Sequence, residues 1–180
     1  MFNKILVALD SQESCDSLFE KARTLAQATQ ADLVLLSVLA PDGDAVLPLL
    51  SYPAMNPAIM GYPLTATDAV WDEYQRRYEA YKAKSLAMLT RYCDQAIAAG
   101  IQAKLSQETG EPGRVICDVA KAENADLIIV GSHGRKGLAE FLIGSVSSYV
   151  MHRAPCSVLV VHPKASSQTK PPESVLSPAC

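Results

Sequence analysis

The sequence predicts an α/β fold in which helices cover both faces of a mostly parallel sheet. Short runs rich in Val, Ile and Leu recur without clean alternation, which is typical of strands covered on both faces. Segments with helical spacing separate these runs, which indicates strand–helix–strand units with right-handed crossovers. A length of 180 residues, with 49% hydrophobic and 19% charged residues, suits one globular domain.

Five segments are expected to form the strands. Four of them are strongly aliphatic, whereas the middle one alternates in polarity and is expected to be more exposed. The expected strands are 4–10, 32–40, 102–108, 126–132 and 157–163.

Three helices of ordinary length are expected between these strands. The first ends at Thr29, and Ser11 or Ser14 is expected to be its N-cap. The next begins at Pro112, which the first turn of a helix tolerates, and Asn124 is expected to end it. The last covers residues 145–153 and ends before a proline.

A Pro-rich segment and a long helix interrupt this rhythm. Residues 41–67 contain five prolines, which forbid a long helix and indicate an extended surface loop. Asp68 is then expected to cap a helix that ends at Gly100. Its first turns carry an aromatic stripe, which we interpret as a buried packing face, with a partner surface as the alternative. The stripe consists of Trp71, Tyr74, Tyr78 and Tyr81.

Charge and cysteine usage exclude several classes of protein. A net charge of −3 gives no broad positive field for nucleic acid or anionic membranes, so neither is an expected partner. The five cysteines include no CxxC pair, which argues against a disulfide scaffold or a zinc site. No apolar run approaches the roughly 20 residues that span a bilayer, and the N-terminus lacks a leader pattern. We therefore expect a cytoplasmic protein.

The stretch GSHGRKGLAEFLIGSV, residues 131–146, contains most of the candidate ligand-binding residues. Gly131 directly follows an expected strand, so it lies at the carboxyl edge of the sheet, where open α/β folds bind ligands. Glycines there let backbone amides approach an anion, and the helix that begins at Ser145 adds free N–H groups and Ser hydroxyls. The spacing predicts a phosphate cradle, although turns and tight helix packing would also explain the glycines.

Several parts of the sequence resemble one family. The spacing Gly131-x2-Gly134-x9-Gly144-Ser145, followed by SSYVMHRAPCSVLVV, is similar to the carboxyl half of the ATP-binding form of the universal stress protein family. KILVALD resembles its first strand, and GEPGRVICDVAKAENADLIIVGSHGRKG resembles its third helix and fourth strand. The resemblance covers residues 3–40 and 85–162.

The resemblance implies a Rossmann-like sheet of order 3-2-1-4-5, as in the adenine nucleotide alpha hydrolases. It implies one domain, residues 1–162, with the Pro-rich insertion 41–67. The Pro- and Ser-rich tail 163–180 is expected to be poorly ordered. The last strand, 157–161, would pair with its copy in a homodimer, because an apolar sheet edge needs a cover.

The resemblance also implies an adenine nucleotide across the sheet edge, either ATP or else ADP or AMP. Asp10 would lie near the ribose or near a Mg²⁺ or Mn²⁺ ion held by the phosphates. Ala8 and Val38 would line the adenine pocket. We add Arg135 as a cation for a terminal phosphate. The residues expected at the nucleotide are Ala8, Asp10, Val38, Gly131, Ser132, His133, Gly134, Arg135, Gly144, Ser145, Val146 and Ser147.

Some of these residues have a simpler interpretation. Asp10 could serve as the N-cap of the first helix, and His133 could contribute only its backbone. His152 and Arg153 suit the last turn of a helix whatever the function. Ser11 stands where the family commonly has glycine, which leaves the surroundings of Asp10 open, and Ser157 replaces a common proline.

The leading hypothesis is a nucleotide-gated switch that acts in stress response and is read by an unidentified protein partner. Two other classes stay open: a nucleotide-independent, chaperone-like dimer and a flavin-binding electron carrier, although the cradle has no obvious aromatic to stack on a flavin. No nucleophile with its base is apparent, so a dedicated enzyme is not expected, and Asp10 with a metal would support slow ATP hydrolysis at most.

Overall fold

The computed structural model describes residues 1–10, 15–40, 65–132 and 144–162, and for residues 65–71 only the backbone. Most of the Pro-rich insertion and the whole tail lie outside these ranges, so the expectations for them stay predictions. The described elements are β1 (Lys4–Ala8), α1 (Asp16–Thr29), β2 (Asp32–Leu39), α4 (Thr65–Ala98), β3 (Ala103–Thr109), α5 (Pro112–Ala122), β4 (Leu127–Gly131), α6 (Ser145–Arg153) and β5 (Ser157–Val161).

The described strands form a five-stranded sheet of order β3-β2-β1-β4-β5 in which every neighbouring pair is parallel. Leu6 of the central β1 lies opposite Val34 of β2 and Ile128 of β4. The predicted fold class and strand order are therefore confirmed. The alternating strand β3 lies at one edge of the sheet and is only partly buried, as expected.

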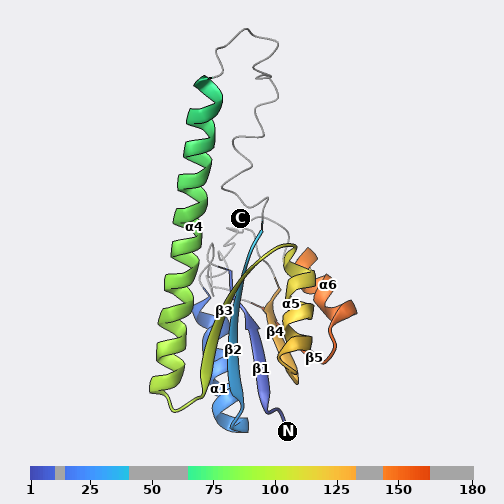
Figure 1. Cartoon of the computed structure of the whole chain (residues 1–180). Helices are drawn as coiled ribbons and strands as arrows, with labels where there is room; N and C mark the ends of the chain where they lie inside the picture. Colours follow the sequence, from blue (N-terminus) through green and yellow to red (C-terminus); the bar gives the residue numbers. More distant parts are fainter. Residues whose placement is uncertain (11–14, 41–64, 133–143, 163–180) are drawn as a thin grey trace, which may run out of the picture.

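Two apolar layers hold the helices on the sheet. α1 and α4 bury Phe19, Leu89 and Tyr92 against one face, and α5 and α6 bury Ile116 and Val150 against the other. Figure 1 shows α4 on one side of the sheet and the pair α5 and α6 on the opposite side. Because successive strand residues point to opposite faces, both layers take their aliphatic side chains from the same strands.

The helix boundaries differ from the expected ones in two places. The N-cap of α1 is Cys15, so the expectation that Ser11, Ser14 or Asp10 occupies it is wrong. α4 begins at Thr65, three residues before the expected cap at Asp68, so the last residues of the presumed insertion are helical. Threonines there look like loop residues by propensity, but a helix that continues from an established body needs no new nucleus.

The other helix ends follow local chemistry. Gly100 after α4 has φ +79°, and Asn124 after α5 has φ +51°, so both predicted stops adopt the left-handed conformation that ends a helix. Pro112 stands in the first turn of α5, as predicted. None of the helices in the described ranges is long and apolar enough to cross a membrane.

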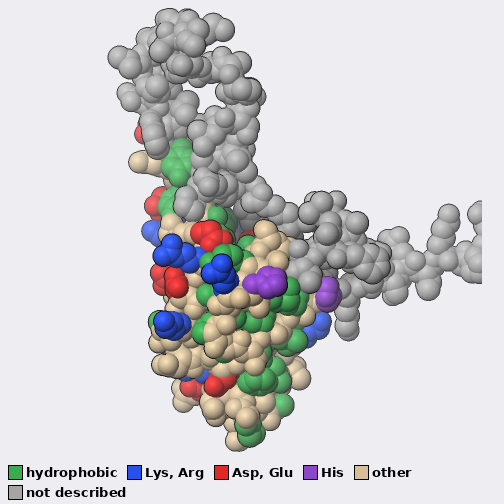
Figure 2. All heavy atoms as spheres, turned by 90° about the vertical axis from the view of Figure 1, so that its right-hand side faces the viewer, with side chains coloured by type: hydrophobic (Ala, Val, Ile, Leu, Met, Phe, Trp, Pro, Cys, Tyr) green, Lys and Arg blue, Asp and Glu red, His purple; other side chains and the backbone are tan. Residues whose placement is uncertain are grey.

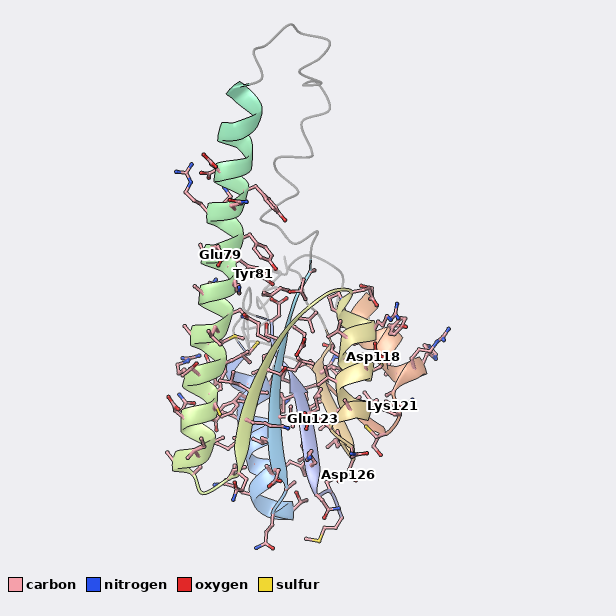
Figure 3. The ribbon with its side chains drawn as sticks, in the orientation of Figure 1. Glu79, Tyr81, Asp118, Lys121, Glu123 and Asp126 are labelled. Carbon is pink, nitrogen blue, oxygen red and sulfur yellow. The ribbon has the colours of Figure 1, made fainter. Side chains whose placement is uncertain are left out.

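Polar contacts fix the packing at two places. Ser85 of α4 donates a 2.8 Å hydrogen bond to Ser37 of β2 inside the apolar layer, where both side chains are buried. At the amino ends of the strands, Asp126 accepts the amides of Asn3 and Lys4 (Figure 3). These backbone hydrogen bonds hold the pKa of the Asp126 carboxyl below its usual value.

Candidate functional site

The carboxyl edge of the sheet between β1 and β4 is the candidate site. The chain leaves β1 toward α1 on one face and leaves β4 toward α6 on the other. The two connections diverge at this point, and open α/β sheets bind ligands in the crevice so formed. Ala8, Asp10, Gly131 and Ser132 end these two central strands, so the topology brings these predicted residues together.

The base of the glycine-rich stretch is closed by hydrogen bonds. The Ser132 amide donates to the Val161 carbonyl at 2.9 Å, and the Gly144 amide donates to the Ser132 carbonyl at 2.6 Å. The Ser147 hydroxyl donates to the Gly131 carbonyl. The two described residues on either side of 133–143, Ser132 and Gly144, are therefore hydrogen-bonded to each other. His133, Gly134 and Arg135 fall between them, outside the described residues, and their roles stay predictions.

The predicted site residues on this side differ in whether their side chains are accessible to a ligand. Ser132 is fully buried and Ser147 is 4% exposed, and the Ser147 hydroxyl already has a protein acceptor. The Ser147 hydroxyl therefore fixes the backbone of β4, and the Ser132 amide is already bonded to the Val161 carbonyl. Of these two residues, Ser147 can still offer its amide to a ligand, at the start of α6. Gly144 and Val146 are half-buried, and Ser145 is exposed at the start of α6.

The start of α6 suits an anion better than the start of α5 does. The first amides of any helix lack carbonyl partners within the helix, and the helix dipole is positive there. At α5 the Glu111 carboxylate already accepts from the amides of Gly113 and Arg114, at 3.2 and 2.9 Å. The N-cap of α6 is Gly144, which has no side chain to fill that role. Within the described residues, no N-cap side chain therefore competes with an anion at the start of α6.

Asp10 and the strand ends beside it lie at the same edge of the sheet. Asp10 is exposed beyond β1, and its carbonyl accepts the Cys15 thiol at 3.2 Å. β2 continues past the end of β1, since Ala8 pairs with Leu36 while β2 runs to Leu39. Ala8 and the overhanging Val38 are half-buried and pack on the layer of α5 and α6. This placement suits an apolar wall for a flat ring.

A tether between α1 and α4, which the sequence did not reveal, fixes the start of α1 next to Asp10. The Tyr92 hydroxyl donates to Asp16 at 2.8 Å, and Arg91 approaches the same carboxylate oxygen at 3.3 Å. The Arg91 guanidinium also lies 4.5 Å from the centre of the Tyr92 ring. Burial, and then the bond to Asp16, raise the pKa of Tyr92. In the sequence, the burial of Tyr92 could have been inferred from its position three residues after Leu89, on the same side of the helix.

The described residues gather no group of three or more His, Cys, Asp or Glu side chains that could hold a metal ion. Asp10 would therefore hold a divalent ion only together with ligands from elsewhere, such as phosphate oxygens. His152 and Arg153 lie in the last turn of α6, as expected from their suitability to the helix dipole.

The fold defines an open α/β protein, and its candidate site lies at the topological switch point of the sheet. Residues 1–162 match the universal stress protein family, and the chain belongs to that family.

Known proteins with similar sequence or structure include the universal stress protein YxiE of Bacillus subtilis, which is 34% identical over 161 residues, covering 89% of this chain and 99% of YxiE. The solved structure of UspA from Lactobacillus plantarum is 26% identical, with a TM-score of 0.66, covering 88% of this chain and 97% of that one. A universal stress protein solved in complex with cAMP is also 26% identical, with a TM-score of 0.59, covering 89% and 97%.

Proposed function

We propose that this universal stress protein binds an adenine nucleotide at the β1–β4 crevice and that the nucleotide controls the surface offered to a protein partner. One observation carries the proposal: the hydrogen bond from the Gly144 amide to the Ser132 carbonyl holds the start of α6, which has no side-chain cap from Gly144, beside the end of β4. Anions bind at such helix starts, and the crevice lies beside them. The cAMP complex of a similar protein supports an adenine ligand.

ATP is the proposed form of the ligand, with ADP or AMP as the products or alternatives. The amides of Ser145, Val146 and Ser147, together with those of residues 133 and 134, would surround the phosphates. Gly131, Ser132 and Gly144 would line the approach, since the amides of the last two are already hydrogen-bonded within the protein. Ala8 and Val38 would contact the adenine, and Arg135 would neutralise a terminal phosphate.

A Mg²⁺ or Mn²⁺ ion would reach this site with the nucleotide. Asp10 would be its protein ligand, and the phosphates would supply the other oxygens. Such an ion would neutralise charge on the phosphates. The described site residues include no general base paired with a nucleophile, so we propose slow ATP hydrolysis at most. We therefore place the protein among regulators in the cytoplasmic stress response rather than among dedicated enzymes.

The proposal is tested by mass spectrometry of small molecules released from gently purified protein, followed by calorimetry with ATP, ADP and AMP. We expect Gly134→Val to weaken ATP binding at least about tenfold, since a branched side chain would keep the amides from the phosphates. Ala87→Val, on the exposed side of α4, is the matched control and should bind like wild type. If calorimetry detects no binding of ATP, ADP or AMP to the wild-type protein, the proposal is wrong.

A second candidate, a dimer that acts without nucleotide, has its own observation. Tyr149, Met151 and Leu159 are 37, 40 and 40% exposed on α6 and the edge strand β5. Figure 2, which views the molecule from the side of α5 and α6, shows hydrophobic side chains at the surface there. A homodimer through residues 157–161 would cover this apolar edge.

A further inference from the structure

α4 is much longer than the sheet it covers. Its 34 residues extend for about 51 Å, and Figure 1 shows the helix running far beyond the carboxyl ends of the strands. Tyr78 is level with the sheet edge, because its hydroxyl lies 3.5 Å from that of Thr109, the last residue of β3. The part of α4 before Tyr78, residues 65–77, is called the overhang below. It projects about 20 Å past the sheet.

One face of α4 continues from the sheet onto the overhang. Ser85 and Leu89 lie on the face that packs against β2 and the core. Steps of three or four residues lead from them to Tyr81, Tyr78 and Tyr74, which are neighbours on one side of a helix. These three residues are called the tyrosine face. The rings of Tyr74 and Tyr78 stack with their centres 6.3 Å apart, and Figure 3 shows Tyr81 on the side of α4 toward the sheet.

The opposite side of the overhang, and of the turn of α4 that follows it, is polar. Gln75, Arg76 and Glu79 are exposed, and Glu73 forms ion pairs with Arg76 and Arg77 at 3.2 and 2.6 Å. A helix that is exposed to water on all sides is usually polar all round. A helix with aromatic residues on one side and charged residues on the other usually has its aromatic side covered. The pattern therefore indicates that something packs on the tyrosine face where the sheet does not reach.

The positions of the two elements that precede and follow residues 41–64 indicate that this segment covers the tyrosine face. β2 ends at Leu39 at the sheet edge, on the side of α4 that bears the tyrosine face, while α4 begins at Thr65 at the distal end of the overhang. The two described ends that residues 41–64 join therefore lie the whole length of the overhang apart, and the first of them lies on that side. At about 3.3 Å per extended residue the segment is long enough to cover this distance more than once.

The composition of the segment matches the face. It contains five prolines among Leu, Val, Ile, Met and Tyr residues, and too few charges to keep it in water alone. Proline rings pack on aromatic side chains, and a Pro-rich chain loses little conformational entropy when it is held extended. We propose that the tyrosine face is the docking site of the chain's own segment 41–64. This proposal does not depend on nucleotide binding.

Hydrogen exchange and limited proteolysis with thermolysin test the docking. Thermolysin cleaves before large apolar residues, of which the segment has several, including Leu49, Leu50 and Ile59. We expect Tyr74→Ala with Tyr78→Ala to speed cleavage within 41–64 at least about fivefold and to abolish slow exchange there, because both report the open population. Alanine is a good helix former, and far-UV circular dichroism checks that α4 persists.

The matched control is Gln75→Ala with Glu79→Ala, the same change at the same spacing on the exposed side, which should cleave at the wild-type rate. Tyr78→Phe keeps the ring and should also retain protection. Equal cleavage in wild type and in the tyrosine variant would overturn the proposal. Protection that rises with protein concentration would overturn it too, because the occupant would then be a segment from a second copy.

Discussion

At the scale of single residues, Tyr92 is the clearest test of the packing near the site. It is 1% exposed, and its hydroxyl donates to Asp16 across the α1–α4 interface. We expect Tyr92→Phe to lower the free energy of unfolding by about 1.5 kcal/mol, the low end of the range for a hydrogen bond to a charged group, because the Asp16 carboxylate is largely exposed. The ring still fills its space. Urea denaturation measures the loss.

The same residue predicts a dependence on alkaline pH. The folded protein raises the pKa of Tyr92 above its ordinary value near 10, so the unfolded chain loses this proton first. The associated stabilisation is full below about pH 10 and disappears as the pH rises further. Between pH 8 and 10.5 the urea midpoint of wild type should fall more than that of Tyr92→Phe. Parallel curves for the two proteins would contradict this assignment.

At the residue scale, the places of the candidate site residues at the strand ends could be predicted from the sequence, whereas the tether could not. Ala8, Asp10 and Gly131 could be placed because each follows an aliphatic run, and the topology then brings parallel strand ends together. Tyr92 and Asp16 are 76 positions apart, and no local pattern pairs them. The same holds for the Ser147 hydroxyl, whose acceptor on β4 depends on how α6 docks.

At the scale of elements, α5 and α6 meet at a glycine. A Cβ atom on Gly113 would lie 2.8 to 3.0 Å from three atoms of Tyr149. Gly113→Ala should therefore destabilise the protein by roughly 1 kcal/mol, since overpacking outweighs the better helix propensity of alanine. Thermal unfolding measures this effect.

A double-mutant cycle separates the contact from propensity. In a Tyr149→Ala background most of the crowding is gone, so Gly113→Ala should be neutral or stabilising, with a coupling of at least about 0.5 kcal/mol. The same cost in both backgrounds would mean that the two helices do not meet in this way.

The elements themselves were largely readable from the sequence. The five strands lie within two residues of their expected bounds, because buried aliphatic runs are specified by their own composition. The start of α4 was missed because Thr65, Ala66 and Thr67 resemble the preceding loop. The spacing of apolar residues does not show how far α4 extends past the sheet. The tyrosines would have the same spacing whether strands or another segment covered them.

At the scale of the whole molecule, the edge strand β5 predicts self-association. Leu159→Lys would place a charge on the proposed dimer edge and should shift the protein from dimer to monomer in size-exclusion chromatography with light scattering. Leu86→Lys is the matched control, because Leu86 is 44% exposed on α4, away from that edge. A monomeric wild type, or equal effects of both variants, would exclude a dimer through β5. ATP added to the dimer then separates the two candidate functions, since only the switch responds to it.

The buried hydroxyl pair of Ser37 and Ser85 restricts how the whole molecule can move. If α4 slid along the sheet by one turn, each hydroxyl would lose its partner inside an apolar layer, which costs about 1–3 kcal/mol per group. A pivot about that point would keep the pair but would disturb the hydrogen bonds from Gln107 to the Lys82 carbonyl and from Tyr92 to Asp16. α4 is therefore held in register at three levels along the sheet, and the strand residue next to this pair, Val38, is kept at a fixed height beside the candidate site.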